Sequence, residues 1–219
     1  VHKAYTLCGF DINWKPRKTS LLLYFAGNGS KAIARFVAAN HPREVPFIDF
    51  CGKVKVVPIV PKYQHMGGIM RSNGAVLTEL RNRYSTLQFE IKPLDHRIFV
   101  NPLVPLDKKL YTAQTILYTK MLYNAGTWPE LNLMESRYLH SKLMYVNRHV
   151  ANSFNVAGNT HVSDQDVLLE LSVAAPAAFV TVFRLRLLVR LARWAPPYLV
   201  LLLCEARGAP RSWVSAIES

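Results

Sequence analysis

One short stretch of the chain combines the residue types that bind phosphate groups. The apolar run over residues 21–25 leads to Gly27-Asn28-Gly29, and a helix-like pattern follows. Glycines let a backbone approach a phosphate closely, and the free N–H groups at a helix start attract the anion. Ala32 fits the third small position of a dinucleotide-binding fingerprint, and Asp49 fits the acidic position about 20 residues further on. The stretch therefore predicts a possible nucleotide site.

The same residues are also typical of an ordinary strand-to-helix turn. In that interpretation Asn28 or Ser30 caps the helix with its side-chain oxygen. No Gly-Lys-Ser or Gly-Lys-Thr sequence follows the glycines, which excludes a phosphate loop of the lysine type. The two interpretations stay open on this stretch alone.

Other patterns that support catalysis or metal binding are sparse. The chain has no adjacent Asp-Asp pair, and its closest two aspartates, Asp164 and Asp166, fall at a predicted helix start, where acidic groups favour the helix dipole. The histidines show no H-E-x-x-H or other ligand spacing. The three cysteines, Cys8, Cys51 and Cys204, are far apart and form no C-x-x-C pair, so we expect neither a zinc site nor a disulfide framework.

The charge of the chain favours a polyanionic partner. Its 219 residues carry 27 Lys and Arg against 14 Asp and Glu, a formal net charge of +13 with a pI near 9.9. The excess is concentrated in residues 1–110, which hold 17 of the basic and 7 of the acidic residues. Nucleic acid and anionic membrane surfaces are the usual partners of such proteins. A basic surface that serves solubility alone is the alternative.

The order of elements that must position these residues predicts an α+β fold. Residues 9–13 and 19–25 are predicted to form a β-hairpin around Pro16, and a helix is expected over 30–40. Residues 53–70 contain two β-rich pieces interrupted by prolines, which indicates edge strands. Helical periodicity then begins after Gly74, with Leu77, Leu80, Tyr84 and Leu87 on one face. Further helices are predicted at about 106–124, 131–151, 163–172, 176–194 and 197–206.

The most apolar segment, residues 167–204, is too interrupted to predict a membrane span. Its longest uncharged run is 171–183, whereas a spanning helix needs about 20 residues. We expect a helix that packs Leu185, Leu188 and Leu191 on the protein body and exposes a basic face; a helix lying on a membrane surface is the alternative. The basic face is formed by Arg186, Arg190 and Arg193. Since no signal peptide is recognised, we expect an intracellular protein, nuclear or cytoplasmic and not secreted.

Three motifs in a fixed order resemble the C-terminal part of a reverse transcriptase of non-LTR (LINE-type) retrotransposons. They are "GFDINWKPRKTSLLLYF", "VPIVPKYQHMGGIM" and "LYTKMLYNAGTWPEL". The first is similar to the D region of the polymerase palm, through Gly9, Phe10, Asn13, Lys18 and Thr19. The second is similar to the E region beside the primer end, through Tyr63, Met66 and Gly67. The third is similar to a thumb element, through Leu122, Tyr123, Gly126 and Trp128.

The resemblance covers roughly residues 3–200 and implies a domain organisation. Residues 1–74 would be a partial palm with its D and E regions, forming a small antiparallel sheet fragment. Residues 75–155 would be a bundle of thumb-like helices, and residues 156–219 a helical C-terminal extension. In this frame the Gly27–Gly29 turn follows the D-region strand, and a phosphate loop is not needed.

The resemblance also implies roles for individual residues. Lys18 matches a lysine near the incoming triphosphate, where it could assist proton transfer to the leaving pyrophosphate; a turn lysine on a basic surface is the alternative. A nucleic-acid-binding set follows from the D region, the primer grip and the first thumb helix: Lys15, Arg17, Lys18, Tyr63, His65, Gly67, Gly68, Arg71, Arg81 and Arg83. A β-turn and a solvated basic face are the alternatives for these positions. Trp128 is expected to be a core anchor.

In function, the resemblance implies a parent enzyme that carries out RNA-directed DNA synthesis with two Mg²⁺ ions. The family's metal-binding aspartates lie upstream of the D region. We therefore expect this chain to be a fragment that lacks them, is inactive alone, holds no cofactor, and keeps at most residual, salt-dependent binding to an RNA/DNA primer-template. Its further partner would be the missing palm and fingers portion. Two alternatives are a basic helical RNA-binding or ribonucleoprotein subunit without enzymatic activity, and a nucleotide-binding enzyme that uses the Gly27–Gly29 turn.

Overall fold

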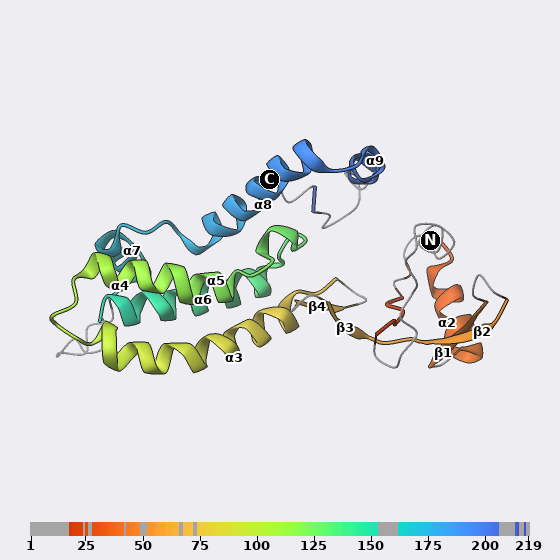
Figure 1. The fold of residues 1–219 in the computed structure, drawn as a ribbon, viewed down its shortest axis with the longest axis horizontal. Helices are drawn as coiled ribbons and strands as arrows, with labels where there is room; N and C mark the ends of the chain where they lie inside the picture. The colour runs from red at the N-terminus through yellow and green to blue at the C-terminus, as the bar shows by residue number, and fades with distance from the viewer. Residues whose placement is uncertain are drawn as a thin grey trace. The chain divides into compact units, whose positions relative to one another are not determined.

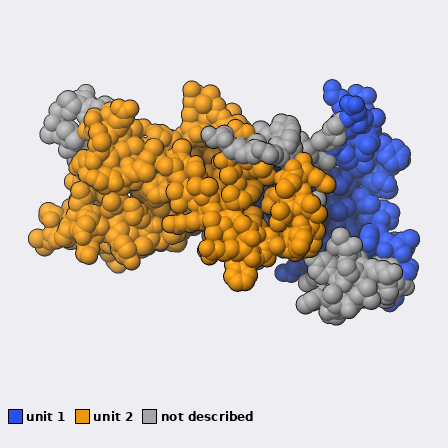
Figure 2. Space-filling view, turned by 90° about the horizontal axis from the view of Figure 1, so that it is seen from above, with its two compact units in different colours: residues 1–75 blue, residues 76–219 orange. Residues whose placement is uncertain are grey.

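The computed structural model describes residues 18–23, 25, 28–41, 43–48, 52–65, 68–71, 74–152, 162–205, 213, 214 and 217. The chain divides into two compact units, Val1–Ala75 and Val76–Ser219, which Figure 2 shows in blue and orange. We call them unit 1 and unit 2 and describe each by itself.

In its described residues, unit 1 combines one helix with two small antiparallel sheets. Its elements are α2 (Ser30–Asn40), β1 (Glu44–Ile48), β2 (Val54–Pro58), β3 (Lys62–His65) and β4 (Gly68–Arg71). β1 pairs with β2 so that Val45 lies opposite Val57, and β3 pairs with β4 so that Tyr63 lies opposite Met70. The unit buries little apolar surface, because Val57 is the one large hydrophobic side chain that is buried among its described residues.

The start of α2 differs from the capping that the sequence suggested. The residue before the helix is Gly29, in a left-handed backbone conformation with φ of 81°, and no side chain caps the helix. The prediction that Asn28 or Ser30 caps it is therefore wrong. Glycine adopts positive φ without the steric penalty of a Cβ atom, so the backbone itself turns into the helix. The N–H of Ile33 then donates to the Gly29 carbonyl at 3.1 Å.

The predicted strand over residues 19–25 is also wrong in the part that the structure describes. Leu21 alone forms a bridge, and its parallel partner is Ile59. The Leu21 N–H donates to the Pro58 carbonyl and the Val60 N–H donates to the Leu21 carbonyl, both at 2.9 Å. This segment therefore bonds to the end of β2 and to the residues just after it, which are remote in the sequence. The other half of the predicted hairpin, residues 9–13, lies outside the described residues.

Unit 2 is helical. Its elements are α3 (Leu77–Leu94), the π-helical η1 (Asp95–Phe99), α4 (Leu106–Thr112), the π-helical η2 (Ala113–Tyr118), α5 (Thr119–Met121), the 3₁₀ turn η3 (Ala125–Thr127), α6 (Leu133–Val150), α7 (Asp164–Leu171), α8 (Pro176–Trp194) and α9 (Pro197–Glu205). The run from α4 to α5 lies beside α3 and α6 (Figure 1). With the two sheets of unit 1, this order confirms the α+β fold class; the assignment of palm, thumb and extension stays a prediction.

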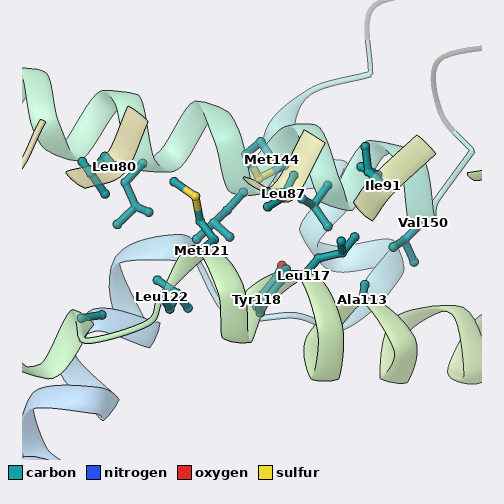
Figure 3. Close-up of a cluster of buried hydrophobic side chains, with 14 of the residues drawn as sticks. Leu80, Leu87, Ile91, Ala113, Leu117, Tyr118, Met121, Leu122, Met144 and Val150 are labelled. Atoms are coloured by element: carbon teal, nitrogen blue, oxygen red, sulfur yellow. The ribbon is translucent and has the colours of Figure 1, made fainter. Parts of the chain in front are cut away.

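The core of unit 2 lies among α3, α6 and the run from α4 to α5. Figure 3 shows that apolar side chains from these elements point toward one another. Leu80 and Leu87 of the predicted apolar face of α3 are fully buried, as is Leu143 of α6. Trp128 is 5% exposed, which confirms the expectation that it anchors the core. Residues three and four positions apart share a helix face, and this explains why the periodicity predicted these contacts.

A buried carboxylate joins the starts of α3 and α6. Glu135 accepts from the N–H groups of Val76 at 2.8 Å and Leu77 at 3.3 Å, and from the N–H of Asn132 at 3.0 Å. The Asn132 side chain in turn accepts from the Glu135 N–H at 2.8 Å, which completes a capping box. One side chain thus pairs backbone donors that the first turns of both helices leave open.

The face by which α8 packs differs from the expected leucine face. Leu185 and Leu188 are exposed, whereas Val180 and Arg184 are buried. The guanidinium of Arg184 donates to the backbone carbonyl of Pro129 at 2.8 Å, so an arginine occupies the packed side. Among the described helices, none is alone long and apolar enough to cross a membrane; α7 and α8 meet the criteria of length and composition together, with a 57° bend between them.

Candidate nucleic-acid interface

In unit 1 the structure brings together one residue of the predicted D region and one of the predicted E region. The hydroxyl of Tyr63 donates to the backbone carbonyl of Lys18 at 2.9 Å. The Lys18 side chain is exposed. Tyr63 thus engages the backbone of Lys18, while the Lys18 side chain is open to solvent.

The β3–β4 hairpin carries the other predicted residues of unit 1. Lys62 lies opposite Arg71 in the register, and both are exposed, so two cations stand side by side. Gly68 is buried and pairs with His65. The predicted residues Lys15, Arg17 and Gly67, together with the side chain of His65, lie outside what the structure describes.

The geometry around Gly29 lacks a feature that a dinucleotide site requires. Such a site needs a regular strand that leads into the glycine turn. Within the described part of residues 18–25 the only strand-like pairing is the bridge at Leu21. Gly27 and Asp49, the other positions of the suggested fingerprint, lie outside the described residues.

The two predicted arginines of α3 have different surroundings. The Arg83 Nε atom lies 2.6 Å from Glu79 Oε1, and its guanidinium lies 4.4 Å from the ring centre of Tyr123. These contacts fix Arg83 within the protein. Arg81 is exposed, and its charge acts on Tyr138 of α6. Of the pair, Arg81 is the one that a phosphate could reach.

Arg81 borders a cluster of aromatic and basic side chains on α3 and α6. We call Arg81, Tyr84, Tyr138, Lys142 and Tyr145 the α3–α6 tyrosine surface. The ring of Tyr84 meets those of Tyr138 and Tyr145 edge to face, with centroids 6.4 and 6.2 Å apart. The Lys142 ammonium lies 4.4 Å from the ring centre of Tyr84 and 5.2 Å from that of Tyr138.

Local helix geometry explains this surface. Tyr138, Lys142 and Tyr145 are spaced by four and three residues on α6, so they share one face. Tyr84 is added by the packing of α3 against α6. The sequence analysis missed the surface, although the spacing of Tyr138, Lys142 and Tyr145 was a usable signal. A lysine over aromatic faces is held by cation–π attraction, which orders its charge without neutralising it.

Two tyrosines of this surface, Tyr84 and Tyr138, have pKa values above the ordinary value for a phenol. Burial, followed by the neighbouring Tyr145 and Tyr138, raises the pKa of Tyr84 above its ordinary value of 10.0. Burial also raises the pKa of Tyr138, while the charge of Arg81 opposes that rise. At neutral pH these hydroxyls therefore remain donors, and the positive charges beside them are not offset by phenolates.

An open pocket of about 550 Å³ adjoins the tyrosine surface and shares Lys142 and Tyr145 with it. Across this pocket Asp164 of α7 accepts from Arg148 at 2.6 Å and contacts His140 Nε2 at 2.9 Å. These two contacts attach α7 to α6. The hydrogen bond with His140, aided by Arg148, lowers the pKa of the Asp164 carboxyl, although burial opposes this.

Asp164 and Asp166 fall at the start of α7, as the sequence predicted. The N-cap side chain of Ser163 accepts from the Asp166 N–H at 3.2 Å. Among the described residues, no group of three or more His, Cys, Asp or Glu side chains is arranged to hold a metal ion.

The described geometry thus defines a helical unit whose α3–α6 tyrosine surface presents ordered positive charge beside aromatic rings. Comparison with known proteins adds no relative to this picture: no family model, no curated protein and no solved structure matches the chain.

Proposed function

We propose that this chain binds nucleic acid through the α3–α6 tyrosine surface, and that it is a fragment of a LINE-type reverse transcriptase that lacks the catalytic aspartates. The observation that carries the binding proposal is the Lys142 ammonium held over the rings of Tyr84 and Tyr138. Ordered cations beside aromatic rings are the combination by which proteins bind single strands and exposed bases.

In this proposal Lys142 and Arg81 contact phosphate oxygens, and the tyrosine rings contact the bases or sugars next to them. The net charge of +13 adds a long-range attraction that is independent of base sequence. The rings contribute because base–aromatic stacking tolerates any base. Binding would therefore be salt-sensitive and weakly selective for sequence.

The proposal of a reverse-transcriptase origin rests on the order of the three motifs. The contact between Tyr63 and Lys18 supports it, because the D and E regions of such a palm are expected to be neighbours. A full-length parent would carry out RNA-directed DNA synthesis, and its two Mg²⁺ ions would be held by carboxylates outside the motifs found here. Lys18 would then lie near the incoming triphosphate.

A basic RNA-binding or ribonucleoprotein subunit without enzymatic activity is the second candidate. The same tyrosine surface favours it, since that surface needs no palm to bind RNA. The two candidates differ in the ligand that they prefer. A reverse-transcriptase fragment should prefer a recessed primer-template, whereas a general RNA-binding subunit should prefer single-stranded RNA.

The experiment is a fluorescence-anisotropy titration of the full chain with three labelled ligands: a recessed RNA/DNA hybrid, a blunt DNA duplex and a single-stranded RNA. The two phosphate contacts of Lys142 and Arg81 would lower the affinity about 12-fold between 50 and 200 mM salt. Preference for the recessed hybrid supports the first candidate, and preference for single-stranded RNA supports the second. The absence of binding at 50 mM salt, or binding that salt does not weaken, would contradict both.

A further inference from the structure

Helix α8 has a second face, turned away from the protein body, that the nucleic-acid proposal does not use. Its packed face is secured by Arg184, which donates to the carbonyls of Pro129 at 2.8 Å and Trp128 at 3.4 Å. Since these contacts fix the rotation of the helix, the opposite face must point outward. That face holds Val182, Leu185 and Val189, which are 42%, 47% and 49% exposed.

The outward face is divided into an apolar and a basic sector. At about 100° per residue, Val182, Leu185 and Val189 fall in one sector of the helix. Arg186 and Arg193 fall in the sector beside it, and both are exposed. Exposed Arg190 extends the basic sector. The exposed surface of α8 is therefore amphipathic, with an apolar sector beside a basic one.

Two exposed aromatic side chains follow the arginines at the junction of α8 and α9. Trp194, the last residue of α8, is 84% exposed, and Tyr198 in the first turn of α9 is 67% exposed. Leu201, one turn further along α9, is 65% exposed. Tryptophan and tyrosine are enriched at the boundary between lipid headgroups and hydrocarbon, because one end of each ring system is apolar and the other is polar.

We propose that the outward face of α8 and α9 docks on an anionic lipid membrane surface. The charges are complementary to such a surface: residues 171–204 contain four arginines and no Asp or Glu. Three of the arginines are exposed on α8, and the fourth is Arg184 on the packed face. The apolar sector enters the headgroup–acyl boundary, and the arginines bind lipid phosphates beside it.

Two other occupants fit this face less well. A second copy of the chain would bring the same three arginines toward one another, which opposes association. A nucleic acid would satisfy the arginines but leave the apolar sector in water. The helices lie on the membrane in this proposal, in keeping with the finding that no single described helix is long and apolar enough to cross one.

The experiment is sedimentation of the full chain with vesicles of phosphatidylcholine alone or of phosphatidylcholine mixed with phosphatidylserine. We expect binding to the mixed vesicles and little to the neutral ones. The triple variant R186Q/R190Q/R193Q should bind the mixed vesicles about 100-fold more weakly, since each arginine near an anionic surface contributes about fivefold. The double variant L185Q/V189Q should bind the mixed vesicles about tenfold more weakly or worse, because its apolar sector no longer enters the lipid boundary.

The matched control is Leu103→Gln, which removes a leucine that is 88% exposed elsewhere in unit 2. It should bind vesicles as the unchanged protein does, and all variants should keep the same far-ultraviolet circular dichroism. A blue shift of tryptophan emission on vesicle binding, absent in Trp194→Phe, would support the docking geometry.

Four results would overturn the proposal. The first is no binding to the mixed vesicles, and the second is binding that the arginine and apolar variants leave unchanged. The third is self-association without vesicles that L185Q/V189Q abolishes, which would assign the face to a second copy. Loss of RNA affinity in the triple variant without any vesicle binding would assign it to nucleic acid. None of these results depends on the tyrosine surface, so the two proposals fail separately.

Discussion

Replacing Glu135 by alanine should destabilise unit 2 more than any change on its surface. The carboxylate is 1% exposed and accepts from the backbone N–H groups of Val76, Leu77 and Asn132. Alanine would leave these donors at the starts of α3 and α6 without that acceptor, in a site where water has little access. Both helix starts would therefore lose their cap in one substitution.

The expected size of this effect follows from the number of donors. A hydrogen bond to a charged group contributes about 1.5–3 kcal/mol, and a buried donor left without a partner costs about 1–3 kcal/mol. The three contacts share one carboxylate and are not additive, so we expect a loss of about 3–5 kcal/mol of unfolding free energy for Glu135→Ala. Glu135→Gln keeps the shape and one acceptor oxygen, and should lose about 2 kcal/mol.

The assay is urea unfolding of the full chain, followed by far-ultraviolet circular dichroism, which reports the helices of unit 2. Glu170→Ala is the matched control, because Glu170 is an exposed carboxylate of α7. Its effect should stay within about 0.5 kcal/mol. If Glu135→Ala were no more destabilising than Glu170→Ala, the capping role of the buried carboxylate would be refuted.

Two further predictions concern the packing of unit 2. Gly126→Ala should lower the unfolding free energy by about 1–3 kcal/mol, because the new Cβ would lie 2.8 Å from the Phe183 carbonyl oxygen of α8. The comparison is Thr127→Ala, which changes the next residue of η3. Equal melting temperatures of the two variants would contradict this prediction. The hydroxyl of buried Tyr118 donates to Asn147, and burial raises the pKa of Tyr118 from 10.0 to about 12. This contribution to stability is complete below pH 10, and about 3 kcal/mol of it should be lost between pH 10 and 12 as the unfolded chain ionises first. Tyr118→Phe should be less stable at pH 7 by about 1–2 kcal/mol and should lose less over that alkaline range; parallel pH profiles would contradict this.

Local patterns predicted most helix boundaries. α2 was predicted over residues 30–40 and α8 over 176–194, and the structure has the same bounds. In α8 the signals are strong because Pro176 fits a first helical turn and the Pro196-Pro197 pair ends the helix. The predicted helix over 106–124 ends at Met121 and contains a π-helical stretch, which residue spacing alone does not indicate.

Features that depend on a remote partner were not predictable in the same way. Leu185 and Leu188 look like a packing face, yet α8 turns Arg184 inward because carbonyls of residues 128 and 129 accept its hydrogen bonds. The pairing of Leu21 with Ile59 likewise joins segments that no local pattern connects. Tertiary contacts therefore decided which of two amphipathic faces was packed.

In the candidate site, too, some features follow from local spacing and others depend on tertiary packing. Lys142 and its two tyrosine neighbours on α6 share a face by spacing alone, but Tyr84 reaches them only because α3 packs against α6. The predicted residue Arg81 borders this cluster, whereas Arg83 is engaged by Glu79 and Tyr123. A sequence shows where the charges are, and the fold determines which of them face outward together.

The most direct test of the central proposal is the affinity of Lys142→Glu for the recessed RNA/DNA hybrid at 100 mM salt, compared with that of Lys108→Glu. Lys108 is an exposed lysine of α4, with a side chain that is 72% exposed, so both variants change the net charge equally. We predict a loss of about tenfold for Lys142→Glu and of no more than about twofold for Lys108→Glu. Equal losses in the two variants would show that net charge alone binds the hybrid and would contradict a role for the α3–α6 tyrosine surface.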